Sequence, residues 1–242
     1  IALAMVYPLA MKFIATWFRA RRGLAMGTML GALTLGSAAP HFVRTLEAGA
    51  DWAIVVSVSS VASLGAAVIF AFILKSGPYE FPRVQADLKQ FGAVLRNRAV
   101  MLANLGYFGH MWELYAMWGW FLAYAMAAKT SGLELGNVSM LAFAVIALGS
   151  PSCVIAGWLA DRIGRSATTA LAMTLSGSSA LAIGFAFNGP VWLFLGLACL
   201  WGFTVVSDSA QFSAAVSELA DQKYVGSALT FQMGVGFAIT IF

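Results

Sequence analysis

The stretch GWLADRIGRS at residues 157–166 lies between two long apolar runs and is the most informative part of the sequence. Asp161 closes one predicted helix, where its own helix dipole disfavours a carboxylate, so it is expected to face a positive group such as another helix N-terminus. Gly164 permits a tight chain reversal. Arg162 and Arg165 can form bidentate bonds with acidic groups. These residues predict a charged latch between helix ends.

The chain around this turn is strongly apolar. Of its 242 residues, 61% are hydrophobic and 10% are charged, with a mean hydropathy of +0.84. A soluble domain carries about 25% charged residues, so lipid must cover most of this surface. Because a membrane-spanning helix needs about 20 apolar residues, the sequence predicts an all-α polytopic transmembrane helix bundle.

Polar links divide the chain into eight expected spans. They cover residues 1–17, 23–43, 52–74, 99–127, 138–160, 167–187, 191–217 and 225–242. The longest hydrophilic stretch, residues 75–98, contains a short segment that is expected to form an amphipathic surface helix. Ile1 and Phe242 both lie inside apolar runs, which predicts that the sequence is truncated at both ends.

The basic residues are distributed very unequally between the two sets of alternate links. Alternate links on one side carry Arg19, Arg21, Arg22, Lys75, Arg83, Lys89, Arg96, Arg98, Arg162, Arg165 and Lys223. The opposite links carry only Arg44 and Lys129. Because cytoplasmic loops of membrane proteins are enriched in lysine and arginine, the first set is expected to face the cytoplasm.

The turn closely resembles the G-x-L-a-D-R-x-G-R-k loop of major facilitator transporters. The matching positions are Gly157, Asp161, Arg162, Gly164 and Arg165. Ser166 departs from the pattern, since a second basic residue is usual there. The segment WFRARRGLAMG at residues 17–27, followed by Leu35 and Gly36, resembles the junction of the fourth and fifth helices of the same superfamily.

The resemblance implies an organisation for the whole chain. It places the spans as helices four to eleven of twelve, with residues 1–75 ending an N-terminal half, 76–98 as the cytoplasmic linker and 99–242 in a C-terminal half. Helices one to three and twelve would then be absent partners from the same chain. By the repeat of the family, Asp161 should face the start of the span near Gly23, and Arg165 should pair with Glu218.

The implied function is secondary transport. We expect a multi-pass protein of the cell membrane that moves a small solute by alternating access, as a symporter or antiporter coupled to protons. Its partners would be the solute, protons and the lipid bilayer, with no nucleic acid and no cofactor. No enzyme is expected, because the sequence has no nucleophile, phosphate or dinucleotide motif in a strand–helix context. The alternative is a non-transporting membrane sensor or receptor on a transporter-like fold.

Ionisable residues inside the spans are candidates for coupling, since burying charge in a membrane is costly. Glu113 and His110 share a helix face and are expected to line the central cavity, where loss of water favours a neutral carboxyl group that can load and release a proton. The alternative is that Glu113 only bonds a neighbouring helix. Asp208 is either a coupling acid or a partner of the Arg162–Arg165 latch. Tyr107 shares the His110 face and is expected to line the cavity.

Two further patterns leave alternatives open. Gly23, Gly27 and Gly31 recur every four residues, which either allows two helix backbones to approach closely or reflects the general abundance of glycine in such helices. The spacing of His110 and Glu113 also occurs in metal sites. Because no third ligand is evident, we expect no metal.

Overall fold

The computed structural model describes residues 9–11, 13–14, 16–18, 20–46, 52–75, 77–79, 92, 94–221 and 224–241. Within these ranges the regular elements are all helices. Most of the first expected span and of the linker 76–98, including most of its amphipathic segment, lies outside the described residues. The helices are α2 (Arg22–Leu46), α3 (Trp52–Phe72), α5 (Arg98–Thr130), α6 (Val138–Ala147), α7 (Gly149–Ile163), α8 (Arg165–Ile183), η1 (Gly184–Ala186), α9 (Val191–Thr204), α10 (Ser209–Leu219) and α11 (Val225–Ile239).

The described helices have the length and composition of membrane spans. Four stretches qualify on both counts, namely α3, α6 with α7, α8 with η1, and α9 with α10. Helices α2 and α5 contain 25 and 33 residues, which corresponds to about 37 and 50 Å at the rise of an α-helix. The hydrocarbon core of a bilayer is about 30 Å thick, so both are long enough to cross it. The all-α bundle expected from the sequence is confirmed.

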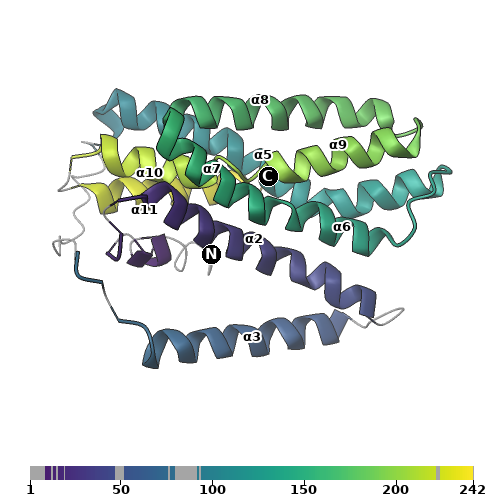
Figure 1. Ribbon diagram of the computed structural model, residues 1–242, viewed down its shortest axis with the longest axis horizontal. Helices are drawn as coiled ribbons and strands as arrows, with labels where there is room; N and C mark the ends of the chain where they lie inside the picture. Colours follow the sequence, from purple (N-terminus) through teal and green to yellow (C-terminus); the bar gives the residue numbers. More distant parts are fainter. Residues whose placement is uncertain are drawn as a thin grey trace.

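Large apolar side chains face outward. Helix α3 has no buried residue and lies at the edge of the bundle beside α2 (Figure 1), with Phe70 also packed near Phe13. Phe185, Leu181 and Trp192 are 88%, 79% and 72% exposed. Water would penalise such a surface, whereas lipid does not. The outer face of the bundle therefore fits a bilayer.

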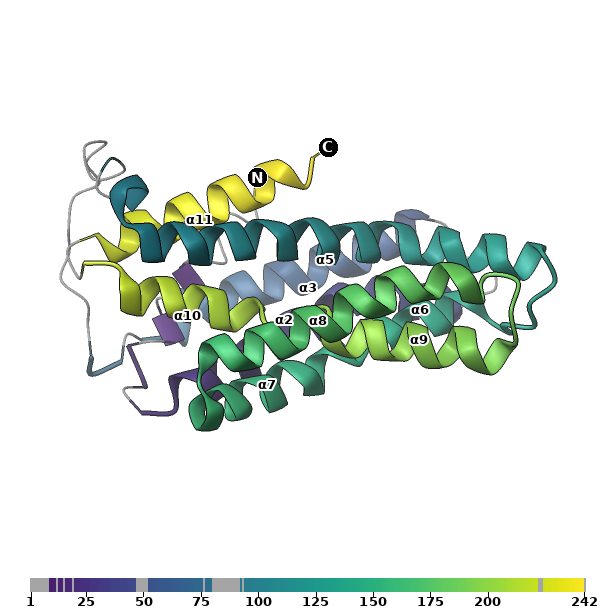
Figure 2. The same ribbon diagram turned by 90° about the horizontal axis from the view of Figure 1, so that it is seen from above.

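The helix ends sort the basic residues onto two sides of the bundle. The N-termini of α2, α5, α8 and α11 lie at one end together with the C-termini of α7 and α10 (Figures 1 and 2). This end carries Arg96, Arg98, Arg162 and Arg165, while Arg44 and Lys129 lie near the other. The basic residues thus gather at one end, which we call the cytoplasmic end after the sidedness that the links predict.

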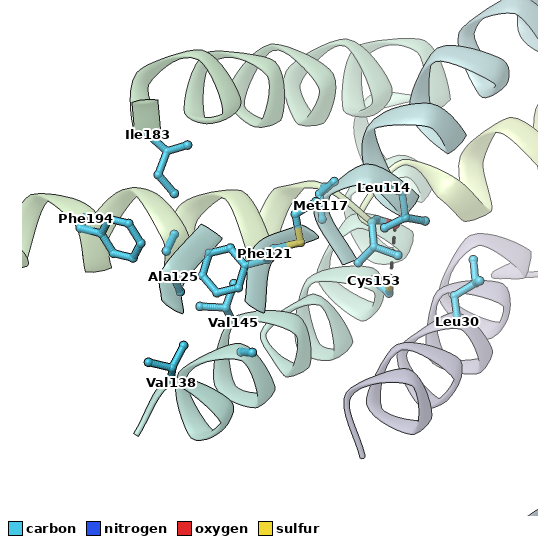
Figure 3. Packing of buried hydrophobic residues seen from close by; sticks show 14 of the residues in the cluster. Leu30, Leu114, Met117, Phe121, Ala125, Val138, Val145, Cys153, Ile183 and Phe194 are labelled. Atoms are coloured by element: carbon cyan, nitrogen blue, oxygen red, sulfur yellow. Dashed lines mark hydrogen bonds between the residues drawn. The ribbon is translucent and has the colours of Figure 1, made fainter. Parts of the chain in front are cut away.

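One side of helix α5 packs into the core of the bundle. Its residues Leu114, Met117, Phe121 and Ala125 are buried and face side chains from five other helices (Figure 3). Those partners include Leu30, Val145, Cys153, Ile183 and Phe194. The N-terminus of α5 is fixed by Asn97, whose Oδ1 accepts hydrogen bonds from the backbone N–H groups of Ala99 and Val100. Such a cap satisfies groups that an unpaired helix end leaves open.

The glycines of α2 lie directly against α7. A Cβ atom on Gly27 would overlap the carbonyl oxygen of Cys153, and one on Gly157 would overlap that of Gly23. On Gly31 it would lie 2.7 Å from the carbonyl oxygen of Ser150. These distances leave no room for a side chain. Of the two readings of the glycine spacing, close approach of two helix backbones is the one that the structure supports.

Two spans that the sequence predicted as continuous are interrupted. Residues 138–160 divide into α6 and α7 around Leu148, three residues before Pro151, which has no N–H to donate to the preceding turn. Residues 191–217 divide into α9 and α10 at residues 205–208. There Thr204 and Ser207 donate their hydroxyls to the carbonyls of Leu200 and Phe203, a pattern that bends helices.

The two interruptions pack on each other. The Cys153 thiol of α7 donates to the carbonyl oxygen of Val206 over 3.6 Å. The hydroxyls of Ser152 and Ser207 are in contact. A Cβ on Gly149 would lie 2.5 Å from Cγ1 of Val206. The irregular backbone therefore lies in the protein interior, where its polar groups find partners away from lipid.

Candidate functional site

The turn between α7 and α8 forms the latch that the sequence predicted at the cytoplasmic end. Gly164 ends α7 with φ +89°, a conformation that glycine adopts without strain. Oδ2 of Asp161 accepts the backbone N–H of Leu24 at 3.3 Å. A Cβ on Gly23 would lie 2.6 Å from Oδ1 of Asp161. The carboxylate thus faces the positive end of α2, as expected from the helix dipole.

Arg165 joins α8 to α10. Its Nε donates to both carboxylate oxygens of Glu218, at 3.1 and 2.9 Å, and its Nη2 donates to Oε1 at 2.7 Å. Its Nη1 donates to Oε1 of Gln211 at 3.0 Å. The predicted Arg165–Glu218 contact is therefore present. Gln211 is a second partner, which the sequence did not assign to this arginine.

Arg162 differs from its neighbour. Its guanidinium lies over the ring of Trp158, 3.9 Å from the centroid. Among the described residues no carboxylate lies within ion-pair distance of it. The expectation that Arg162 binds an acidic group is therefore not met here. A cation–π contact within one helix takes its place.

A buried ionisable pair lies near the middle of α5. Nδ1 of His110 is 2.8 Å from Oδ1 of Asp208, and the two side chains are 1% and 3% exposed. Asp208 is the residue directly before α10, at the interruption of its span. The structure places Asp208 beside His110 and not beside the latch arginines, a pairing that the sequence analysis did not foresee; its alternative role as a coupling acid stays a prediction. Buried charge is tolerated when it is paired, which explains the juxtaposition.

Aromatic rings enclose this pair. The rings of Tyr107 and Phe212 lie 6.0 and 5.9 Å from the imidazole of His110. Tyr107 is buried and also packs edge-on against Phe212, 6.1 Å away. In the described part of the chain Tyr107 therefore belongs to the wall around the pair, and its predicted contact with solute stays a prediction.

Glu113 points to other helices than His110 does. Its Oε1 accepts the hydroxyl of Ser176 on α8 at 2.5 Å and the indole N–H of Trp201 on α9 at 2.9 Å. The three-residue spacing placed the two side chains on one helix face, but their partners separate them. The contacts are those of the alternative in which Glu113 joins neighbouring helices.

The contacts of Glu113 predict how its substitution changes the free energy of unfolding. Glu113→Gln keeps an oxygen that can accept both bonds, so its free energy of unfolding should change by less than about 1 kcal/mol. Glu113→Ala leaves the Ser176 hydroxyl and the Trp201 N–H without an acceptor and should lose about 2 kcal/mol or more. Thermal unfolding of the purified protein measures both, with Trp201→Phe as the control for one lost bond. Equal losses for both variants would show that the charge of Glu113, and not its acceptor oxygen, matters.

Three groups that the sequence analysis did not use also lie in this region. Asn104 and Gln232 are fully buried amides on α5 and α11, and Ser213 is a buried hydroxyl on α10. The signal that could have found them is a polar residue inside an apolar span. In the described residues no group of three His, Cys, Asp or Glu side chains is arranged to hold a metal ion.

Two comparisons with known proteins point to the same family. The sequence pattern of the Major Facilitator Superfamily matches residues 1–242. The chain is 30% identical over 173 residues to the MFS-type transporter pytF of Aspergillus terreus (strain NIH 2624 / FGSC A1156), a match that covers 68% of this chain and 55% of the relative. The chain thus spans about half the length of this relative. No solved structure matches it.

Proposed function

Because the chain belongs to the Major Facilitator Superfamily, we propose that it is part of a secondary transporter that moves a small solute by alternating access. The family and the apolar helices make it a multi-pass membrane protein. The relative pytF is described as an MFS-type transporter, which supports transport as the activity. We further propose that the protein acts in the cell membrane and that residues 1–75 and 99–242 belong to two halves joined by residues 76–98.

We propose that His110 and Asp208 couple transport to protons. The observation that carries this proposal is the 2.8 Å contact between the two side chains in the buried middle of the bundle. The imidazole is charged only when it holds a second proton on its ring nitrogens. Gain or loss of that proton alters the attraction between α5 and α10. The pair is therefore a suitable place for a proton to bias two conformations.

The latch supports the alternating-access part of the proposal. Asp161 faces the start of α2, and Arg165 holds Gln211 and Glu218 of α10. These bonds connect the cytoplasmic ends of elements that we assign to different halves or repeats. The side chains of Arg165 and Glu218 are 17% and 50% exposed, so water can replace these bonds and they can break at moderate cost. A reversible contact suits a gate.

Flux measurements test the proposed function. The full-length protein, reconstituted in liposomes, should accumulate at least one member of a radiolabelled panel of carboxylates, amino acids, sugars and organic cations. Accumulation should require an imposed pH gradient and should stop when a protonophore collapses it. A folded protein that moves no member of the panel in either direction would instead support the sensor alternative. Solute flux that does not depend on the pH gradient would contradict proton coupling but would leave transport itself supported.

The latch gives a separate prediction. Arg165→Ala should shift the protein toward states open to the cytoplasm by roughly tenfold, the change that corresponds to about 1.4 kcal/mol. Electron–electron distance measurements between spin labels at the exposed positions Ala20 and Ser166 report this opening. Arg162→Ala is the matched control, because it removes the same charge from the same turn but no bond to α10. An equal shift in both variants would show that net charge, and not the Arg165 contacts, keeps the end closed.

A further inference from the structure

One side of α5 carries a buried polar stripe. Asn104, Tyr107 and His110 follow one another at intervals of three residues and are 0%, 1% and 2% exposed. This spacing places successive side chains on neighbouring positions of one helix side. The upper end of the stripe meets Asp208 of α10. From there the stripe runs toward the cytoplasmic end of α5.

The lower end of the stripe lies at about the level of Gln232 of α11. A Cβ on Gly236 would lie 2.6 Å from Cε1 of Tyr107, which fixes how the two helices are aligned. Gln232 comes one turn before Gly236, and Asn104 comes one turn before Tyr107. Because α5 and α11 run in the same direction (Figure 2), the two amides occupy the same level of the α5–α11 contact. Both are fully buried.

These amides lack the partners that buried polar groups need. Among the described residues, Oδ1 of Asn104, Nε2 and Oε1 of Gln232 and Nε2 of His110 have no hydrogen-bond partner. The Nδ2 group of Asn104 reaches only the sulfur of Met101, at 3.9 Å. Lipid offers no partner either. Apolar side chains of the same shape would be more stable here, so the amides are expected to hold a polar occupant.

We propose that Asn104 and Gln232 bind internal water that supplies protons to the imidazole of His110. A buried water needs two to four polar partners, and the three unpartnered amide atoms provide them. The inference rests on the proposed proton coupling and names the path by which the proton arrives.

The chemistry of the path is simple. Water passes one proton to the unpartnered Nε2 of a neutral His110 and receives one from the next water, so no other bond changes. Nδ1 stays in contact with Asp208. The other ionisable groups around the imidazole are Tyr107 and Glu113 of its own helix, Cys153 of α7, and Arg165 of α8, which reaches Gln211 one turn from Asp208. Helix α11 contributes none.

An apolar cluster seals the path at the cytoplasmic end. Val100, Val216 and Ala228 are buried together below the two amides. They come from α5, α10 and α11, so movement of α10 or α11 away from α5 would open the cluster to water. Release of the Arg165–Glu218 contact frees α10 for such a movement. The latch and the water path would then open together on the cytoplasmic side.

Radiolytic labelling tests the water site directly. The full-length protein in lipid nanodiscs is irradiated in H₂¹⁸O, so that hydroxyl radicals formed from bound water oxidise the side chains beside it. We expect ¹⁸O on Tyr107 and Met101 although Tyr107 is buried, and a roughly tenfold loss of this label when the partners of the water are removed in N104L/Q232M. A wild-type protein without label at these residues would overturn the water site.

Stability and flux complete the test. N104L/Q232M should melt at a higher temperature than the wild type, whereas Ser179→Ala, which removes a buried hydroxyl already bonded to the Leu175 carbonyl, should not. A double variant that melts lower and keeps the label would assign the amides to packing. The two proposals fail separately. If the label is present but His110→Gln keeps proton-driven flux, the proposed coupling is wrong and the water site is supported. If the label is absent while His110→Gln loses that flux, the water site is wrong and the coupling is supported.

Discussion

Replacing Gly27 with alanine should lower the free energy of unfolding by about 2–3 kcal/mol, although alanine favours helices over glycine by about 1 kcal/mol. The new Cβ would overlap the backbone carbonyl oxygen of Cys153 on α7. A backbone atom cannot rotate away as a flexible side chain can, so α2 and α7 must separate. Thermal unfolding of the purified full-length protein measures the loss.

A glycine on the same helix provides the control. Gly36 has nothing within 4 Å of an added Cβ among the described residues, so Gly36→Ala should be neutral or stabilising. Gly157→Ala should behave like Gly27→Ala, because its Cβ would overlap the Gly23 carbonyl. If Gly27→Ala is as stable as Gly36→Ala, the close contact between α2 and α7 does not support the fold.

Asp208→Asn should reduce proton-driven accumulation of solute on the order of 100-fold, or about 2.7 kcal/mol in transition-state terms. An amide neither takes up a proton nor stabilises the charged imidazole of His110 across the buried 2.8 Å contact. Exchange of labelled for unlabelled solute at equal pH needs no net proton movement and should continue. Uptake by proteoliposomes with and without a pH gradient separates the two activities.

The two residues should act as one unit. His110→Gln should lose as much driven uptake as Asp208→Asn, and the double variant should lose little more, because each single change already disables the pair. Glu113→Gln is the matched control for a carboxylate inside the bundle, and it should keep driven uptake. Additive losses from His110 and Asp208 would show that they work separately. If Glu113→Gln also loses proton-driven uptake, Glu113 would take part in proton coupling.

Local patterns were enough to predict the cytoplasmic turn. Asp161 at a helix end required a positive partner, and the structure supplies the start of α2. Arg165 and Glu218 are 53 residues apart and were joined through the repeat of the family. Arg162 shows the limit of this reasoning, because Trp158 one turn earlier in its own helix offered a nearer contact than any acid.

The buried pair could not be predicted in the same way. Helical spacing placed His110 and Glu113 on one face, but spacing says nothing of which neighbouring helix each side chain meets. Ser176 and Trp201 draw Glu113 toward α8 and α9, while Asp208 arrives beside His110 because its span bends at residues 205–208. The interruption itself has only weak sequence signals, namely Thr204 and Ser207 within an apolar run.

The sequence alone determined that lipid surrounds this chain and roughly where its apolar spans lie, and it predicts which end faces the cytoplasm, since these follow from counts of apolar residues and the positions of charges along the chain. Only the tertiary structure decided that Gly27 meets a backbone, that His110 takes Asp208 as partner, and that Asn104 and Gln232 share one level of the α5–α11 contact. The physical reason is that solvent preference acts on each residue separately. Partner choice depends on the bends and alignment of helices that are distant in sequence.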